Sequence, residues 1–267
     1  MNVEYKHTVK ELWIYPIKSI GGMCVDNAMA LPEGFQYDRR WMLIDENGQF
    51  VTQREHFKLS TFSSTIADNK LIISHKGETI DTPLDQTTPD TVRVQVWSSK
   101  LKAQEVNPDV SNWFSVKLSM KVTLVKMTDI SKRPRRLFVP PYKTTLSFAD
   151  GYPYLILGAE SMNELNAKLD HPVLPDRFRA NIIVSSSIPH EEDKWKGLNA
   201  GNAQLQVIKP CARCVMITVN QQTGKTGKEP LKTLAAYRKK RNKIYFGANA
   251  ICTKDGIISV GDRLEIM

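Results

Sequence analysis

The chain has 267 residues, a length that predicts one large domain or two small ones. Charged residues make up 24% and hydrophobic residues 41% of it, which excludes general disorder, a collagen-like chain and a coiled coil. Lysine and arginine number 37 against 28 aspartate and glutamate residues, so the net charge is +9. A basic chain of this kind is expected to meet anions such as nucleic acid, a phosphate-bearing cofactor, an acidic protein or a membrane surface.

The four cysteines, Cys24, Cys211, Cys214 and Cys252, are too few and too scattered for a disulfide framework. The first ten residues lack the apolar stretch of a secretory signal. No run approaches the roughly 18 apolar residues that a membrane helix needs. We therefore expect a cytoplasmic protein with no membrane partner.

Short β-rich runs with turn signals between them dominate the first hundred residues. The turn Asp45–Gly48, which ends in Asn-Gly, is typical of a β-hairpin. Residues 1–100 therefore predict a β-barrel-like domain. The strands expected in it are Val9–Ile17, Trp41–Asp45, Gln49–Thr52, Lys70–Ser74 and Val92–Val96.

Residues 101–267 predict a second domain, with strands and a few short helices. Helices are expected at Ser111–Leu118, with Ser111 as the N-cap, at Ser161–Leu169, with a capping box that starts at Ser161, and at Pro230–Lys240. Residues 129–147 combine basic residues with prolines, which indicates an exposed loop. The fold class is thus mixed and mainly β, with peripheral helices. The strands expected here are Lys121–Met127, Asn181–Val184, Gln204–Ile208, Val215–Val219 and two short ones within Ile257–Ile266.

Three familiar motifs are incomplete or absent. The segment Thr223–Lys228 resembles part of a phosphate-binding P-loop, but Val219 stands where that motif needs its first glycine. The five histidines show no metal-ligand spacing, and no serine-hydrolase elbow is present. A nucleotide site, a zinc hydrolase and a serine hydrolase therefore have no support.

A Cys-Ala-Arg-Cys motif at 211–214 is the short segment of the chain with the most chemically reactive side chains. A zinc knuckle would need a second Cys/His pair, and Cys24 and Cys252 stand alone. A thioredoxin-like dithiol would need a helix directly after the motif, whereas 215–219 predicts a strand. Two buried thiols, or one soft thiolate that ligates a metal already held by another cofactor, are the remaining interpretations. Arg213 would favour the thiolate.

Several segments, taken together and in chain order, resemble the MOSC-domain proteins, a family that includes the mitochondrial amidoxime reducing component and bacterial relatives. Those in the first half are similar to the family's N-terminal β-barrel domain, and those in the second half to the MOSC domain itself. Each motif is weak alone, but the collinear set covers nearly the whole chain. The segments are Tyr15–Ser19, Gly34–Trp41, Val51–Arg54, Phe148–Pro153, Arg177–Ile182, Lys209–Cys214, Thr223–Gly224, Glu229–Leu234 and Val260–Asp262.

The resemblance implies a molybdenum cofactor, Mo-molybdopterin. The second cysteine of the motif, Cys214, would be the catalytic residue and would supply a thiolate to molybdenum, while the role of Cys211 stays open. Because molybdopterin ends in a phosphate, its pocket should offer cations, hydroxyls and backbone N–H groups. The cofactor-binding residues that the resemblance implies are Lys18, Ser19, Arg39, Asp150, Gly151, Tyr152, Arg179, Asn181 and Ala212.

Three of these residues also have ordinary structural interpretations. Arg39 would pair with Asp38, Lys18 would be a solvated lysine at a strand end, and Asp150 would cap a turn. In the cofactor role, Asp150 would accept hydrogen bonds from pterin N–H groups. Arg54 matches the family but is given no cofactor role.

The resemblance further implies the two-electron reduction of N-hydroxylated compounds: amidoximes, hydroxylamines and N-hydroxylated bases. No iron–sulfur cysteine cluster is visible, so the electrons are expected to come from a separate protein. The segment Lys225–Lys243 has eight basic residues and one acidic residue, a balance of +7, which suits an acidic donor. A solvated, lysine-rich helix is the ordinary alternative.

Two other functions compete. Lys132–Arg136 and Arg238–Arg241 would contact nucleic acid, but no aromatic residues are interleaved with these runs, so no nucleic acid is expected. MOSC domains also occur in a sulfurase, so a carrier of molybdenum cofactor or sulfur without turnover is the alternative to an enzyme. At the domain level the family is associated with pyridoxal phosphate binding. No pyridoxal-phosphate domain is visible, which makes a full sulfurase a poor match.

Overall fold

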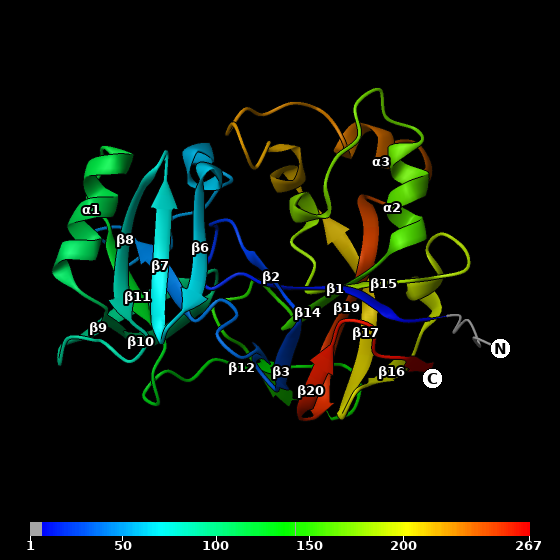
Figure 1. The fold of residues 1–267 in the computed structure, drawn as a ribbon, viewed down its shortest axis with the longest axis horizontal. Coiled ribbons are helices and arrows are strands. Elements are labelled where there is room, and N and C mark those ends of the chain that lie inside the picture. The colour runs from blue at the N-terminus through cyan, green and yellow to red at the C-terminus, as the bar shows by residue number, and fades with distance from the viewer. Residues whose placement is uncertain (1–6, 142) are drawn as a thin grey trace.

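The structure is a computed structural model that describes residues 7–141 and 143–267. The first six residues, on which part of the targeting expectation rests, lie outside this range. Figure 1 shows one half with α1 (Pro108–Leu118) beside short sheets, and another with α2 (Ala159–Asn166) and α3 (Leu231–Arg238) at the edge of a larger sheet. The chain is mainly β with few helices, as the sequence predicts.

The half with α1 is built from two antiparallel sheets around one core. Along Lys70–His75 and Thr91–Val96, apolar residues alternate with polar ones, so one face of each strand is buried. The strand Trp41–Ile44 is buried on both faces. Phe62, Trp41 and Phe114, from both sheets and α1, are fully buried in this core. In sheet order the strands are β5 (Trp41–Ile44), β11 (Thr123–Lys126), β10 (Ser99–Glu105) and β9 (Thr91–Val96), and then β6 (Phe62–Ala67), β7 (Lys70–His75) and β8 (Glu78–Pro83).

The larger sheet combines strands from both ends of the chain. Its order is β2-β1-β15-β14-β19-β17-β16-β21, with β18 paired to β19. A separate sheet has the order β20-β3-β4, in which β3 pairs with both neighbours. The pairing of β1 with β15 brings Leu12 and Ile14 into one core with Ile156 and Ile182. The strands are β1 (Val9–Ile14), β2 (Met23–Val25), β3 (Asn27–Leu31), β4 (Gly34–Phe35), β14 (Tyr154–Gly158), β15 (Ile182–Val184), β16 (Gly197–Ala200), β17 (Ala203–Arg213), β18 (Lys239–Lys240), β19 (Lys243–Lys254), β20 (Gly256–Ser259) and β21 (Leu264–Ile266).

The sheets therefore do not follow the chain in order. Residues 9–35 pair with strands of the second half, and Figure 1 shows β1 and β2 lying beside β14 and β15. The division of the chain into units 1–100 and 101–267 stays a prediction. What the pairing shows is that the first segment shares a hydrophobic core with the last.

β17 and β19 form the longest pair and carry the cysteine motif at one end. Their register shifts between Val207 and Lys209 and again between Pro210 and Ala212. Proline cannot donate to a ladder, and bulges of this kind turn the side chains of a strand in new directions. The irregular end of β17 is therefore the part that aims Cys211 and its neighbours.

Both predicted helix caps are wrong. α1 begins at Pro108, and Asn107 caps it by accepting a hydrogen bond from the Asp109 backbone N–H at 2.8 Å. α2 begins at Ala159, and Ser161 lies inside it, where its hydroxyl donates to buried Glu192. Each helix starts one turn or less before the predicted cap. Asn107 caps α1 with its side chain, whereas Gly158 precedes α2 and caps it without a side-chain hydrogen bond.

Other boundaries differ in detail. The predicted strand Gln49–Thr52 is wrong: this segment makes only isolated bridges, from Gln49 to Gln95 and from Phe50 to Ile44. The hairpin turn before it is confirmed, with the Gly48 N–H donating to the Asp45 carbonyl. Over residues 7–141 and 143–267, no helix is both long and apolar enough to cross a membrane.

Candidate active site

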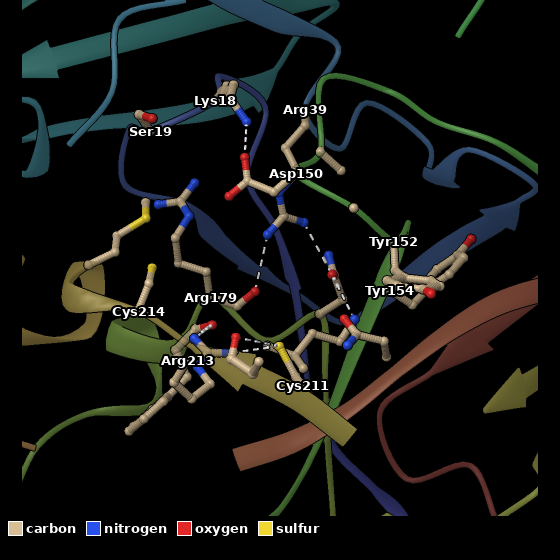
Figure 2. A pocket seen from close by; sticks show the side chains of 18 of the residues that line it. Lys18, Ser19, Arg39, Asp150, Tyr152, Tyr154, Arg179, Cys211, Arg213 and Cys214 are labelled. Atoms are coloured by element: carbon tan, nitrogen blue, oxygen red, sulfur yellow. Dashed lines mark hydrogen bonds and ion pairs between the residues drawn. The ribbon is translucent and has the colours of Figure 1, made fainter. Parts of the chain in front are cut away.

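A cavity of about 450 Å³, called the main cavity below, is lined by residues from both halves of the chain. Figure 2 shows Lys18, Asp150 and Arg39 in its upper part and the two cysteines in its lower part. All ten site residues that the resemblance implied lie on its walls. They are Lys18, Ser19, Arg39, Asp150, Gly151, Tyr152, Arg179, Asn181, Ala212 and Cys214.

Lys18 is buried, with only 5% of its surface exposed, so the alternative of a solvated lysine is wrong. Its Nζ donates to the Phe148 carbonyl at 2.8 Å and forms an ion pair with Asp150. Burial lowers the pKa of Lys18 to about 8, although Asp150 acts in the opposite direction. The positive charge of Lys18 is thus held at the cavity wall, although its removal from water costs free energy.

Asp150 lies at the centre of a cluster of donors. Its Oδ1 takes the ion pair from Lys18 and a hydrogen bond from Trp97 Nε1 at 3.2 Å, and its Oδ2 accepts from Arg54 Nη2 at 2.7 Å. Burial by itself would raise the pKa of Asp150, but Lys18 and Arg54 outweigh it and hold that pKa well below its usual range. The carboxylate is therefore ionised and engaged at both oxygens.

Arg39 joins the two halves of the chain at the cavity. Its Nη1 pairs with buried Asp38 at 2.5 Å, as the structural alternative expected, and also donates to Asn181 Oδ1 at 3.1 Å. Its Nη2 donates to the Arg179 carbonyl at 3.1 Å. The ion pair and the position on the cavity wall are both present, so the two interpretations of Arg39 do not exclude each other.

Arg179 is 8% exposed, and its guanidinium stacks over Tyr15 at 4.3 Å. Nη1 donates to the Ile20 carbonyl at 2.7 Å, whereas Nη2 is buried without a hydrogen-bond partner. Burial lowers the pKa of Arg179 to about 10, and Arg39 adds to the effect. A buried donor of this kind is costly unless something accepts from it.

Three of the ten residues have a left-handed backbone. The φ angles of Ser19, Arg39 and Arg179 are 67°, 52° and 55°. This conformation is uncommon for residues other than glycine and is retained where the surroundings fix it. The backbone itself therefore turns these side chains toward the cavity.

The two cysteines of the motif differ in surroundings. Cys211 is half-buried and packs against the core beneath α2 and α3, and its sulfur accepts from Arg213 Nη1 at 3.2 Å. Cys214 is exposed and lies on the cavity wall. Burial acts against the charge of Arg54, but the nearby Asp150 and, after it, Cys214 raise the pKa of Arg54. Cys214 is the motif cysteine with a free path to a ligand.

The predicted strand Val215–Val219 is wrong. A single 3-10 turn, Val215–Thr218, follows Cys214, and Val215 is exposed. The sequence argument against a thioredoxin-like dithiol relied on that strand, so that reason does not hold. Across the described parts of the chain, no group of three or more His, Cys, Asp or Glu side chains is placed to hold a metal ion.

The prediction of an exposed loop at 129–147 is also wrong in part. The segment contains a hairpin of β12 (Pro134–Arg136) and β13 (Lys143–Thr145), and Arg133 is only 4% exposed. Arg133 donates to the carbonyls of Ser147, at 2.8 Å, and of Ala149. Its neighbour Arg135 stacks over Tyr152 and lines the main cavity. Two residues of the basic run, Arg133 and Arg135, therefore lie at or behind the cavity wall, whereas Lys132 and Arg136 are exposed.

The wall also holds twelve residues to which the sequence assigned no cofactor role, and five of them are basic. Arg54 stood in a matching segment without a role, and Arg135 was assigned to the surface. Of the described residues that line the cavity, eight are lysine or arginine and one, Asp150, is acidic. Their positions beside quoted motifs were the available signal. The wall residues without an assigned cofactor-binding role are Arg54, Arg135, Ala149, Tyr154, Leu155, Arg177, Phe178, Lys209, Cys211, Arg213, Met216 and Asn249.

Comparison with known proteins identifies the family. Residues 6–121 match the MOSC N-terminal beta barrel domain, and residues 143–265 match the MOSC domain. The chain is 32% identical over 280 residues to the mitochondrial amidoxime-reducing component 1 of Mus musculus, covering 97% of this chain and 82% of that protein. The chain belongs to the MOSC family, as the sequence motifs predicted.

A second group of relatives is longer. The chain is 32% identical over 266 residues to the molybdenum cofactor sulfurase of Oryza sativa subsp. japonica, which covers 90% of this chain but 32% of that protein. The chain thus spans about a third of that relative. Among solved structures, the YUAD protein from Bacillus subtilis matches 98% of this chain and 97% of its own at 13% identity, with a TM-score of 0.45.

Proposed function

We propose that this chain is a molybdenum-cofactor-dependent oxidoreductase that reduces N-hydroxylated compounds with electrons from a separate donor protein. The observation that carries the proposal is the main cavity, where an exposed thiol lies among eight cations. The similarity to mitochondrial amidoxime-reducing components supports the substrate class. The substrates are amidoximes, hydroxylamines and N-hydroxylated bases.

The residues present fit the cofactor. A phosphate-bearing pterin needs cationic donors, and the buried Arg179 Nη2, which has no partner in the chain, is such a donor. Lys18 and Lys209 add charge on the wall. A Cβ added at Gly151 would meet only the tip of Arg135 at 4.0 Å, so the backbone there is open to a ligand. Cys214 offers the soft sulfur that suits molybdenum in a sulfur-rich sphere.

When bound, the molybdenum cofactor would supply the two-electron redox chemistry on the N–O bond. The chain's own residues have simpler tasks. Cys214 would ligate the metal, and Arg179, Arg39 and Lys18 would bind the anionic tail of the pterin and orient it. Asn181, whose amide oxygen and amide nitrogen both have protein partners, would hold Arg39 in place.

The test is the molybdenum and pterin content of the protein from a host that makes the cofactor, followed by turnover of benzamidoxime with reduced methyl viologen. We expect close to one molybdenum per chain and formation of benzamidine. Cys214→Ala should lose turnover, because the metal loses its protein ligand, while the far-ultraviolet circular dichroism spectrum stays unchanged. A fully active Cys214→Ala protein that contains molybdenum would contradict the assignment.

The same experiment distinguishes the proposed reductase from the alternative function, a carrier of molybdenum cofactor or sulfur. The similarity to molybdenum cofactor sulfurases is the observation that favours it. A carrier would contain molybdenum but leave the amidoxime unchanged, and it would pass the cofactor to a cofactor-free acceptor enzyme. Turnover by the loaded protein would reject the carrier.

A basic patch beside the main cavity suits the electron donor. A second cavity, of about 680 Å³, is lined by Arg238–Arg241 and shares Lys209 with the main cavity. Lys239, Lys240 and Arg241 are exposed there. Because opposite charges steer association and orient a partner, this patch would dock an acidic electron-transfer protein close to the redox site.

A further inference from the structure

We infer that Phe138 and Val139, at the tip of the hairpin of β12 and β13, form the apolar anchor of the surface on which the electron-donor protein docks. The partner would present an apolar area bordered by acidic side chains. The inference rests on the proposed function, because it takes a separate protein as the source of electrons. It adds to the basic patch at 239–241 a second point of contact, whose attraction does not depend on charge.

The tip is exposed although the hairpin below it is fixed. Among the described large hydrophobic residues, Phe138 has the greatest exposed fraction, and Val139 is 38% exposed. Leu137, directly before them, is buried. Arg133, one residue before β12, is also buried and donates to two backbone carbonyls. A partner that packs on the Phe138 ring therefore meets a side chain on a firm support and orders little of this chain.

Basic residues lie on both sides of the tip in the hairpin. Lys132, Arg136 and Lys143 are exposed, and Arg136 and Lys143 are partners in the hairpin ladder. Residues 130–147 contain no aspartate or glutamate. An apolar centre with a polar, charged border is the usual composition of a protein–protein interface. Because complementary charge steers and orients a partner, the border of this tip favours an acidic one.

The hairpin starts at the wall of the main cavity. The guanidinium carbon of Arg135, in β12, lies 4.7 Å from the centroid of the Tyr152 ring, and Lys209 Nζ lies 5.2 Å from the same centroid. Lys209 also lines the second cavity, beside the basic patch. Figure 2 shows Tyr152 across the main cavity from Cys214. One partner could thus contact the hairpin and the patch with its redox group toward the cavity. An anionic membrane would also be attracted, but only a donor gains from this position.

The experiment compares the tip variant, Phe138→Ser with Val139→Ser, with the wild-type protein, both loaded with molybdenum. The probe is flavodoxin, a small acidic flavoprotein. Calorimetry measures its affinity for the chain over a series of salt concentrations, and turnover of benzamidoxime gives the KM for reduced flavodoxin. The matched control is Ile257→Ser with Val260→Ser, because these residues are 50% and 43% exposed and line neither the main cavity nor the second one.

We expect the tip variant to bind flavodoxin about tenfold more weakly and to raise its KM by the same factor, because the burial of a phenyl ring is lost. The dependence of the affinity on salt should stay as in the wild-type protein, since no charge has changed. The rate with reduced methyl viologen and the thermal midpoint of unfolding should also stay unchanged. Phe138→Leu, which keeps an apolar side chain, should retain most of the affinity, and the control should behave as wild type.

Equal affinity and KM in the tip variant and the wild-type protein would overturn the inference, and so would an equal loss in the control. Wild-type protein that binds no flavodoxin at low salt would overturn it as well. Vesicles of phosphatidylserine and phosphatidylcholine test the membrane: sedimentation with them that is lost in the tip variant would assign the tip to a lipid surface, against the inference. Failure of the proposed function differs from all of these, because the wild-type protein would then reduce no benzamidoxime even with methyl viologen.

Discussion

Asn181 accepts a hydrogen bond from Arg39, with 3.1 Å between Oδ1 of Asn181 and Nη1 of Arg39. The same amide donates to the Trp13 carbonyl at 3.2 Å and accepts from the Leu155 N–H at 3.3 Å. The side chain is 1% exposed. One buried amide therefore ties the first strand of the chain, the loop before β5 and the centre of the larger sheet together at the wall of the main cavity.

Asn181→Ala should destabilise the protein by about 3 kcal/mol, because it leaves buried partners without hydrogen bonds. Urea unfolding followed by circular dichroism measures the change. Asn163→Ala is the control: Asn163 is exposed on α2, and its loss should change the free energy of unfolding by less than about 0.5 kcal/mol. Equal losses for the two variants would contradict the role given to Asn181.

Arg133→Met should also lower the free energy of unfolding, by about 2–4 kcal/mol, because the carbonyls of Ser147 and Ala149 lose their buried donor. Methionine keeps much of the buried stem and so isolates the loss of the hydrogen bonds. The exposed Arg136, changed to Met in the same way, should have almost no effect in urea unfolding. If Arg133→Met matched it, the segment before Asp150 would be held by other contacts.

Anion binding in the main cavity should weaken as the pH rises above about 8. Burial lowers the pKa of Lys18 to about 8, so this cation loses its proton through that range. Sulfate is a suitable probe, because its own charge does not change between pH 6.5 and 9.5. Calorimetric titration of cofactor-free protein should show the loss for wild type and a flat profile for Lys18→Arg. A flat wild-type profile would place the titration of Lys18 outside this range.

The same shift predicts a rise in stability with pH. Between about pH 8 and the ordinary value of 10.5, the folded chain binds fewer protons at Lys18 than the unfolded chain does. Stability rises with pH wherever the unfolded state binds more protons. Lys18 should therefore contribute a positive slope to the free energy of unfolding in that window. Urea unfolding of wild type and Lys18→Arg at pH 7.5 and 9.5 checks the sign, since the variant should lack that contribution.

Cys211→Ala should keep molybdenum and at least about a third of the turnover, in contrast to Cys214→Ala. Cys211 packs against the core and binds Arg213, but Cys214 alone of the two is exposed on the cavity wall. The exchange removes one sulfur and a weak hydrogen bond, and its cost is about 1–2 kcal/mol of stability. Loss of molybdenum from Cys211→Ala would show that both sulfurs are needed.

Charge reversal at Lys239, Lys240 and Arg241 to Glu should raise the KM for an acidic donor about tenfold, because it removes the attraction that steers association. The probe is a small acidic flavoprotein, reduced chemically, and the rate with reduced methyl viologen should stay unchanged. Added salt should slow the wild-type protein and leave the variant almost unaffected. Equal KM values for both proteins would exclude this patch as the docking site.

The sequence predicted those helices and strands well whose structure depends mainly on their own residues. β5, β7, β9 and α3 follow from alternation or helical spacing and lie within a few residues of the predicted ranges. The sequence-based predictions were wrong where the structure of a segment depends on contacts with residues far away in the chain. Val215–Val219 has the composition of a strand, yet Val215–Thr218 forms a 3-10 turn just after β17 ends at Arg213, and Val219 makes a single bridge to Thr226.

The basic charge of the chain also divides into what the sequence determines and what only the tertiary structure determines. By itself, the sequence determined that the chain is mainly β, belongs to the MOSC family, carries +9, and has a thiol pair flanked by arginine. Only the tertiary structure decided which cations are internal: Lys18, Arg133 and Arg179 are buried, and Arg54 pairs with Asp150 from the other half of the chain. The physical reason is that ion pairs and burial depend on contacts between residues far apart in sequence, whereas periodicity reports only on near neighbours.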